Sequence, residues 1–247
     1  MSTFYEVDLR VGSRDVDLFD QCRPSAVLGL LQEAATQAAL VLGASGPEVL
    51  AKYNCLWMIT RSWVELDAPL RWNDLIHIKT WHRGGAGASS YRDFDLFRDG
   101  EPVGQGTSQW VLVDADSRRL FRMKNLAEFQ GTDGGGLNKP IKLHRPAMPQ
   151  TFDHRVRRDM RYSDTDINGH INNARYADFA CDCLHLEEAG RGKFVRSFQI
   201  GYVGECRAGE TIWVDTAQRG DELFARGEGE DGAERFDFSL KLEDLKI

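Results

Sequence analysis

Side chains that could do acid–base chemistry are crowded into one stretch, Tyr162–Tyr176. Within ten residues this stretch holds two carboxylates, an imidazole and three amides: Asp164, Asp166, Asn168, His170, Asn172 and Asn173. A carboxylate can fix the tautomer of an imidazole and raise its basicity, and an amide can bind a developing oxyanion. In an extended backbone, residues two apart lie on the same side, so Asp166, Asn168 and His170 could converge on one point.

The alternative interpretation of this stretch is structural. Asn and Asp side chains commonly cap helices and stabilise turns without taking part in any reaction. A helix is predicted immediately afterwards, from Asn172 to about Ala189, and a strand immediately before, from Phe152 to Tyr162. The spacing alone therefore leaves both a catalytic loop and a capping loop open.

The first half of the chain shows the same order of elements. Phe4–Val11 alternates apolar and charged residues and is predicted to be a strand with one buried face. A helix is predicted from Pro24 to Leu42. From Ala26 to Leu42, polar side chains interrupt this helix at only four positions: Gln32, Glu33, Thr36 and Gln37. We therefore expect it to be surrounded on most sides.

Four strand-like runs follow each predicted helix. They lie near residues 55–67, 74–82, 89–98 and 102–113 in the first half, and near 194–203, 210–217, 222–228 and 234–242 in the second. The glycine-rich run Gly84–Gly87 lies between two of them, and no Lys-Ser/Thr follows it. This favours a hairpin turn over a phosphate-binding loop. Residues 131–150, rich in Gly and Pro, are predicted to be a linker between domains at 1–130 and 151–247.

The repeated order of elements indicates an internal duplication. Placing Asp15–Gln21 over Asp164–His170 aligns the acidic residues of the two segments. This register places Phe19 opposite Asn168 and Gln21 opposite His170. A second register, with Trp72–Ile78 over Ala208–Val214, places Pro69 opposite Glu205 and Leu70 opposite Cys206. We therefore expect the second half to react and the first to shape the site.

Composition narrows the possible functions. The 247 residues carry a net charge of −7, which argues against a general nucleic-acid or anionic-membrane binder. The five cysteines are odd in number and show no metal-ligand spacing: Cys22, Cys55, Cys181, Cys183 and Cys206. This indicates a reducing compartment and no metal. No membrane-length apolar run or presequence pattern is found, so we expect a cytoplasmic protein.

Several segments resemble the acyl-acyl carrier protein thioesterase family, the plant plastid enzymes and their bacterial relatives. In the second half these are Asp164–Tyr176 and Gly204–Cys206. In the first half they are Leu30–Ala35, Leu56–Glu65, Trp72–Leu75 and Thr107–Val111. The resemblance implies the α+β class and a tandem hot-dog fold, in which two long helices are each wrapped by an antiparallel β-sheet. The absence of a plant-type transit segment suggests a bacterial version.

The resemblance also implies a reaction. The family hydrolyses the thioester between a fatty acyl chain and the phosphopantetheine arm of the carrier protein, and it needs no cofactor. The family's catalytic positions fall on Asp166, Asn168, His170 and Glu205, and a once-proposed nucleophile position falls on Cys206.

We expect each of these residues to have its own role. Glu205 would activate water, Asn168 would place it, and His170, oriented by Asp166, would polarise the thioester or protonate the thiolate. Amides of the helix beginning near Asn172 would bind the oxyanion. Direct attack by Asp166 stays open, and Cys206 is disfavoured as a nucleophile because it suits a small buried hydrophobe.

The sequence also leaves two alternative functions open and predicts one partner-binding surface. The alternatives are an acyl-CoA thioesterase of the same fold and a non-catalytic acyl-binding regulator. Because the chain is acidic, attraction of an acidic carrier protein requires a local basic patch. The candidate is Arg155, Arg157 and Arg161, predicted to share one face of a strand. We expect a monomer or a homodimer.

Overall fold

Two compact units make up the part of the chain that the computed structural model describes, residues 4–122, 131 and 143–245. The first unit draws on Met1–Arg10, Gly29–Val64 and Asp74–Leu143. The second draws on Val11–Leu28, Glu65–Asn73 and His144–Ile247. Each unit is thus assembled from separate segments of the chain. The predicted domain limits remain a prediction, and residues 132–142 of the predicted linker lie outside the described residues.

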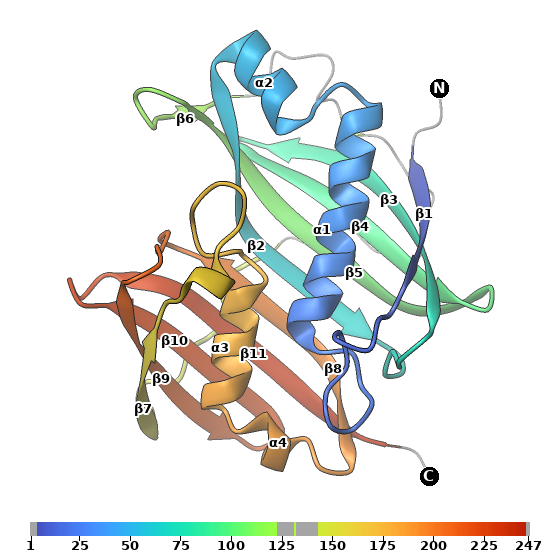
Figure 1. Ribbon diagram of the computed structural model, residues 1–247, viewed down its shortest axis with the longest axis vertical. Helices are drawn as coiled ribbons and strands as arrows, with labels where there is room; N and C mark the ends of the chain where they lie inside the picture. The colour runs from blue at the N-terminus through green and yellow to red at the C-terminus, as the bar shows by residue number, and fades with distance from the viewer. Residues whose placement is uncertain (1–3, 123–130, 132–142, 246–247) are drawn as a thin grey trace. The chain divides into compact units, whose positions relative to one another are not determined.

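The sheet of the first unit has the strand order β1-β3-β4-β5-β2, with β6 paired to β5 (Figure 1). Its strands are β1 Tyr5–Arg10, β2 Cys55–Leu66, β3 Leu75–Ala86, β4 Ser89–Arg98, β5 Glu101–Asp114 and β6 Leu120–Phe121. The pairs β1–β3, β3–β4 and β4–β5 are antiparallel. The predicted hairpin is confirmed, although β3 continues to Ala86 through a bulge, and Gly87, with a φ of +69°, begins the turn.

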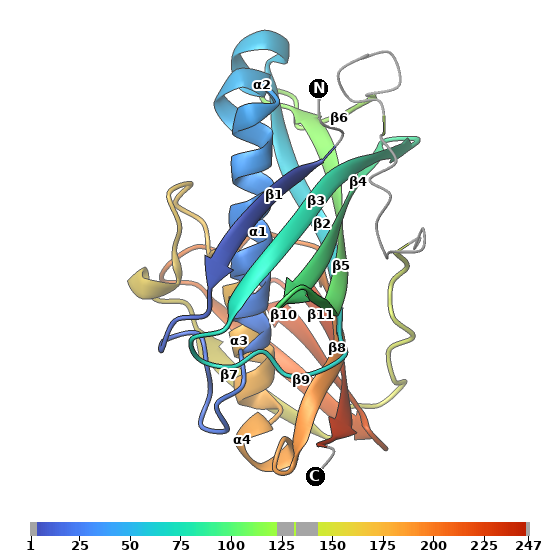
Figure 2. The same ribbon diagram turned by 90° about the vertical axis from the view of Figure 1, so that its right-hand side faces the viewer.

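Helix α1, Pro24–Val41, confirms the predicted first helix, and Figure 2 shows it along one face of the first sheet. Ala34 and Ala38 are fully buried. A Cβ on Gly106 of β5 would lie 3.0 Å from Leu31 Cδ1, so this close approach requires glycine. The expectation that the helix is covered on most sides is wrong at its C-terminal end, where three side chains are exposed: Leu40, Val41 and Leu42.

A short helix, α2 Gly46–Tyr53, was not predicted. Ser45 caps it, and the Glu48 carboxylate accepts the Ser45 N–H at 3.0 Å in a capping box. No single helix among the described residues is long and apolar enough to cross a membrane, although α1 and α2, bent by 47°, pass that test together on length and composition.

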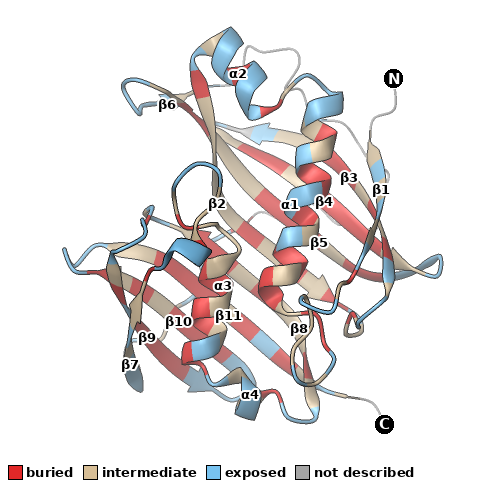
Figure 3. Ribbon diagram, viewed as in Figure 1, coloured by how far each residue is buried: buried red, intermediate tan, exposed pale blue. Residues whose placement is uncertain are grey.

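The sheet of the second unit has the order β8-β11-β10-β9-β7, with antiparallel pairing throughout. Its strands are β7 His154–Asp159, β8 Lys193–Tyr202, β9 Thr211–Arg219, β10 Glu222–Gly229 and β11 Glu234–Asp244. Helix α3, Arg175–Cys183, contacts β9, β10 and β11. Phe179, Phe236 and Phe238 are buried between the helix and the sheet, where Figure 3 shows the buried residues of this unit.

The prediction of one long helix in the second half is wrong. The segment forms α3 and a separate four-residue helix, α4 Leu186–Ala189. His185 between them has a φ of +51°, a left-handed conformation that ends α3. The start is also later than predicted, because the Asn172 side chain accepts the Ala174 N–H at 2.9 Å and holds a turn there.

The predicted duplication is visible in the backbone hydrogen bonds of two loops in the second unit. The N–H of Asp17 donates to the Gln21 carbonyl at 2.8 Å, and the N–H of Asp166 donates to the His170 carbonyl at 2.9 Å. One carboxylate oxygen of each aspartate accepts the N–H two residues later, both at 2.8 Å. The loops 15–23 and 164–172 therefore share one backbone frame.

A second pair of bonds confirms the alignment around the neighbouring loops. Cys22 N–H donates to the Leu70 carbonyl at 2.7 Å, and Ile171 N–H donates to the Cys206 carbonyl at 2.9 Å. This is the correspondence that placed Leu70 opposite Cys206. Residues Pro69 and Glu205, one position earlier, are consequently equivalent as well.

Candidate active site

Asp164 anchors the loop that connects β7 to α3. Its side chain is buried. One carboxylate oxygen accepts the N–H of Arg161 at 2.9 Å, and the other accepts the Arg175 guanidinium at 3.1 Å. These contacts assign to Asp164 the capping role that was the structural alternative for this stretch.

The segment Asp166–His170 is a tight turn. The Asp166 carboxylate accepts the N–H of Asn168 at 2.8 Å, and its carbonyl accepts the N–H of Gly169 at 3.0 Å. Gly169 has a φ of +75°, which suits glycine. The extended backbone assumed from the spacing is therefore wrong, and alternation does not make Asp166, Asn168 and His170 converge. Asn168 lies exposed at the tip of the turn.

His170 faces Glu205 instead of Asp166. The distance from His170 Nε2 to Glu205 Oε2 is 3.5 Å, and the two side chains are 23% and 44% exposed. Within the described ranges, no hydrogen bond joins the Asp166 carboxylate to this imidazole. The structure thus brings together two of the four predicted catalytic residues and uses Asp166 to shape the turn.

Arg207 is a member of this cluster that the sequence did not reveal. Its Nη2 lies 3.3 Å from His170 Nε2. The backbone N–H of Arg207 donates to the Glu210 carboxylate at 3.1 Å. A guanidinium can only donate, so Nε2 is the acceptor in this contact when the imidazole carries its single proton on Nδ1. When Nε2 carries a proton, Glu205 is the partner that it faces. The only sequence signal was a basic residue two positions after Glu205.

Cys206 is buried, unlike the partly exposed His170–Glu205 pair. It lies with Glu205 in the loop between β8 and β9, and its side chain is fully buried. Its N–H donates to the Tyr176 hydroxyl at 3.0 Å. Burial raises the pKa of the Cys206 thiol, so the thiolate needed for attack is disfavoured.

The predicted oxyanion donors near Asn172 are already engaged. The N–H of Asn172 donates to the Asp164 carbonyl at 2.9 Å, and the N–H of Arg175 donates to the Asn172 carbonyl at 2.9 Å. The N–H of Ala174 donates to the Asn172 side chain. These three amides are satisfied inside the loop and are not available to an oxyanion, and the oxyanion role of the other amides at this helix start stays a prediction.

The three arginines of the predicted docking patch do not share a strand face. Arg161 follows the end of β7, and all three are paired with acids. Arg155 contacts Glu228 at 2.5 Å, and both Arg157 and Arg161 contact Asp159, at 2.9 and 3.1 Å. Arg157 and Arg161 remain more than half exposed, so their charge is partly compensated but accessible.

In each unit an antiparallel sheet packs against a helix. Two such units in one chain form a tandem hot-dog fold. Family models match both halves of the sequence. The acyl-ACP thioesterase N-terminal domain matches residues 2–128, and the acyl-ACP thioesterase C-terminal domain matches residues 149–239. The chain belongs to the acyl-ACP thioesterase family.

Individual relatives support the same family. The chain is 23% identical over 252 residues to the oleoyl-acyl carrier protein thioesterase 2 of Arabidopsis thaliana, covering 93% of this chain and 67% of that protein. It spans between 58 and 67% of the length of such plastid relatives.

Solved structures share the fold. An acyl-ACP thioesterase from Bacteroides thetaiotaomicron aligns with a TM-score of 0.84 at 19% identity, covering 98% of each chain. The 12:0-ACP thioesterase from Umbellularia californica aligns with a TM-score of 0.82 at 19% identity, covering 99% of each chain.

Proposed function

We propose that the chain hydrolyses acyl-acyl carrier protein thioesters to a free fatty acid and the carrier protein. The observation that carries this proposal is the His170–Glu205 pair, 3.5 Å apart in the second of two family domains. A carboxylate beside an imidazole at a partly exposed position can take a proton from water and return it to a leaving group. Hydrolysis of a thioester requires both transfers.

The reaction balances with these two residues and water. Glu205 removes a proton from water as the oxygen bonds to the acyl carbon. Collapse of the tetrahedral intermediate breaks the carbon–sulfur bond, and the thiolate receives the proton through His170. The products are a carboxylic acid and the pantetheine thiol. Asn168, exposed at the tip of its turn, places the water or the substrate carbonyl.

Asp166 is a positioning residue in this scheme. Its carboxylate already accepts the N–H of Asn168, and an oxygen held in a turn is a poor nucleophile for direct attack. Arg207 helps to orient the imidazole through its contact with Nε2. The buried thiol of Cys206 supports a role in packing.

The carrier protein is proposed as the partner through the exposed arginines of β7 and the loop that follows it. Arg157 and Arg161 add positive charge close to the catalytic loop in sequence. We also propose a cytoplasmic location in a bacterium, since none of the five cysteines, all of them described, forms a disulfide.

One experiment tests the function directly. The protein is incubated with acyl-carrier protein and acyl-CoA of equal chain length, and thiol release is measured. We expect faster release from the carrier protein, and release should be lost in Glu205→Gln. A higher kcat/KM on acyl-CoA would identify a CoA thioesterase instead. Binding of both substrates without thiol release would identify an acyl-binding regulator.

A further inference from the structure

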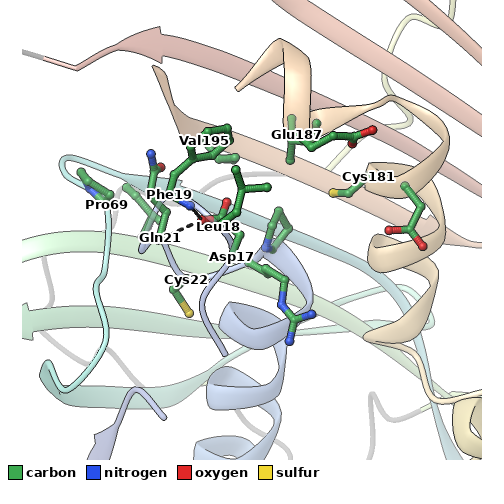
Figure 4. A pocket seen from close by; sticks show the side chains of 14 residues that line it. Asp17, Leu18, Phe19, Gln21, Cys22, Pro69, Cys181, Glu187 and Val195 are labelled. Carbon is green, nitrogen blue, oxygen red and sulfur yellow. Dashed lines mark hydrogen bonds between the residues drawn. The ribbon is translucent and has the colours of Figure 1, made fainter. Parts of the chain in front are cut away.

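A cavity of about 160 Å³ lies in the second unit, between loop 15–23 and helices α3 and α4. Figure 4 shows Cys181 and Glu187 on one side of it, with Asp17, Phe19 and Gln21 on the other. It is separate from the His170–Glu205 pair, since neither residue lines it. The proposed reaction gives this cavity no role.

The cavity occupies the duplicate of the catalytic position. Loop 15–23 has the same backbone hydrogen bonds as loop 164–172, so Gln21 stands where His170 stands in the other loop. Pro69, another lining residue, corresponds to Glu205. Gln21 donates its side-chain amide to the Lys193 carbonyl at 2.8 Å. Neither replacement can move a proton, so this place lacks the imidazole–carboxylate pair of the other loop.

The charged residues that line the cavity disfavour the binding of an anion. Three carboxylates line the cavity, those of Asp17, Asp182 and Glu187, against one guanidinium, that of Arg23. Burial raises the pKa of Asp182 although Arg158 lies 3.6 Å from its carboxylate, and Glu187 is paired with His185 at 3.2 Å. The remaining lining is mainly apolar, including Phe19 and Val195. A fatty-acid product would therefore be repelled, whereas a neutral chain with N–H donors would find both acceptors and apolar contacts.

The size of the cavity suits a slender ligand. An apolar cavity of about 150 Å³ in another protein is large enough for benzene. The end of a pantetheine arm, an amide followed by two methylenes and sulfur, has a comparable number of heavy atoms. It is uncharged, and its amide N–H can donate to a carboxylate.

We propose that this cavity is a second, non-hydrolytic binding site for the neutral, sulfur-bearing end of a pantetheine arm. The proposal rests on the proposed function, because that function brings pantetheine to the protein. Occupancy would hold a carrier protein whose arm carries no acyl chain, because the cavity has room for the end of the arm alone. The site would therefore act as a holding or inhibitory position.

The test uses the full chain and S-methylpantetheine, which cannot be hydrolysed or alkylated. Iodoacetamide modification of Cys181, which lines the cavity, is followed by peptide mass spectrometry. We expect saturating S-methylpantetheine to slow this modification at least threefold. Decanoate, an anion, should not slow it. Unchanged Cys181 modification, or equal protection by decanoate, would overturn the proposal.

Two variants make the test specific. Val195→Trp should fill the cavity and reduce the calorimetric stoichiometry of S-methylpantetheine from two sites to one, while the exposed control Val203→Trp keeps both. If Val195→Trp does not fold, Phe19→Trp replaces it. Two sites persisting in a folded cavity-filled variant would overturn the proposal.

Failure of the proposed function can be told apart from failure of this site. Thiol release from acyl-carrier protein is measured on the same wild-type preparation. Absent release with intact Cys181 protection would remove the function and leave the binding site. Thiol release without protection of Cys181 would support the function and overturn the binding site.

Discussion

The hydroxyl of Tyr176 accepts a hydrogen bond from the backbone N–H of Cys206 at 3.0 Å. Tyr176 belongs to α3, and Cys206 follows Glu205 directly. The helix therefore fixes the loop that carries the proposed general base. Ring contacts of Tyr176 with Phe179 and Phe236, at 5.9 and 5.5 Å between centroids, hold the phenol in place.

Tyr176→Phe should lower both stability and activity. The Cys206 N–H would be left buried without a partner, at a cost of about 1–3 kcal/mol in the free energy of unfolding. Glu205 would lose its fixed position, so kcat should fall more than KM rises. Denaturant unfolding and steady-state kinetics measure the two effects. The exposed Tyr162→Phe serves as the control and should change neither. Unchanged stability in Tyr176→Phe would show that the bond is dispensable.

Glu205→Gln should abolish most thiol release while the fold is kept, because it removes the base and preserves the volume. Cys206→Ala should retain substantial activity and lose roughly 1 kcal/mol of stability, since a buried side chain becomes smaller. Kinetics and circular dichroism on both variants provide the measurement. An inactive but folded Cys206→Ala beside a fully active Glu205→Gln would reverse the assignment.

Alkaline pH should destabilise the protein partly through Cys183. Burial raises the pKa of this thiol from 9.0 to about 11. The unfolded chain therefore loses the thiol proton first, and stability that is present below pH 9 is lost as the pH rises towards 11. The difference corresponds to at most about 2–3 kcal/mol. Cys183→Ala should show a shallower decline of unfolding free energy between pH 9 and 11. An identical slope would contradict the burial argument.

Charge reversal at Arg157 and Arg161 together should raise KM for acyl-carrier protein a few-fold and flatten its salt dependence. The effect is modest because Asp159 already compensates part of the charge. Hydrolysis of a short acyl-pantetheine should be nearly unchanged. Reversal of Arg118 and Arg119, in the other unit, is the matched control. Equal losses on both substrates would mean that the arginines support the fold.

Residue Leu31 should influence the preferred acyl chain length. Its side chain is buried against Gly106, in the unit that lacks the proposed catalytic residues. Each additional buried methylene of a substrate is worth about 0.8 kcal/mol, so a change in side-chain size can shift preference by a couple of carbons. Leu31→Ala should favour longer products and Leu31→Phe shorter ones, measured by gas chromatography of released acids. No shift in either variant, with shifts from second-unit changes only, would place the acyl site elsewhere.

The pattern of apolar and polar residues in the sequence predicted the strands and the first helix well. Alternation in β1 and the apolar run after Pro24 report which faces are covered, and the structure keeps those faces. The errors arose where a side chain or a single backbone angle competes with regular structure. His185 breaks a helix by adopting a left-handed conformation, and Asp166 bends the catalytic stretch into a turn. Periodicity carries no signal for either.

The candidate site shows the same limit. His170 was named from its residue type and spacing and Glu205 from a resemblance, and their proximity depends on two loops meeting in space. Arg207 was missed because no local pattern connects it to His170, 37 residues away. Contacts between distant loops require the fold before they can be recognised.

The two matched turns at Asp17 and Asp166 also bear on how such a chain can change over generations. Their defining bonds use the backbone and one aspartate, and none depends on the side chains at positions 19, 21, 168 or 170. Catalytic side chains can therefore be lost or regained in either copy by substitution, without a change in the path of the backbone. After a gene duplication, one copy of such a turn can change its other side chains while its aspartate preserves the shape of the turn. Replacing Phe19, Gln21 and Pro69 with the residues of the other copy would retrace that change.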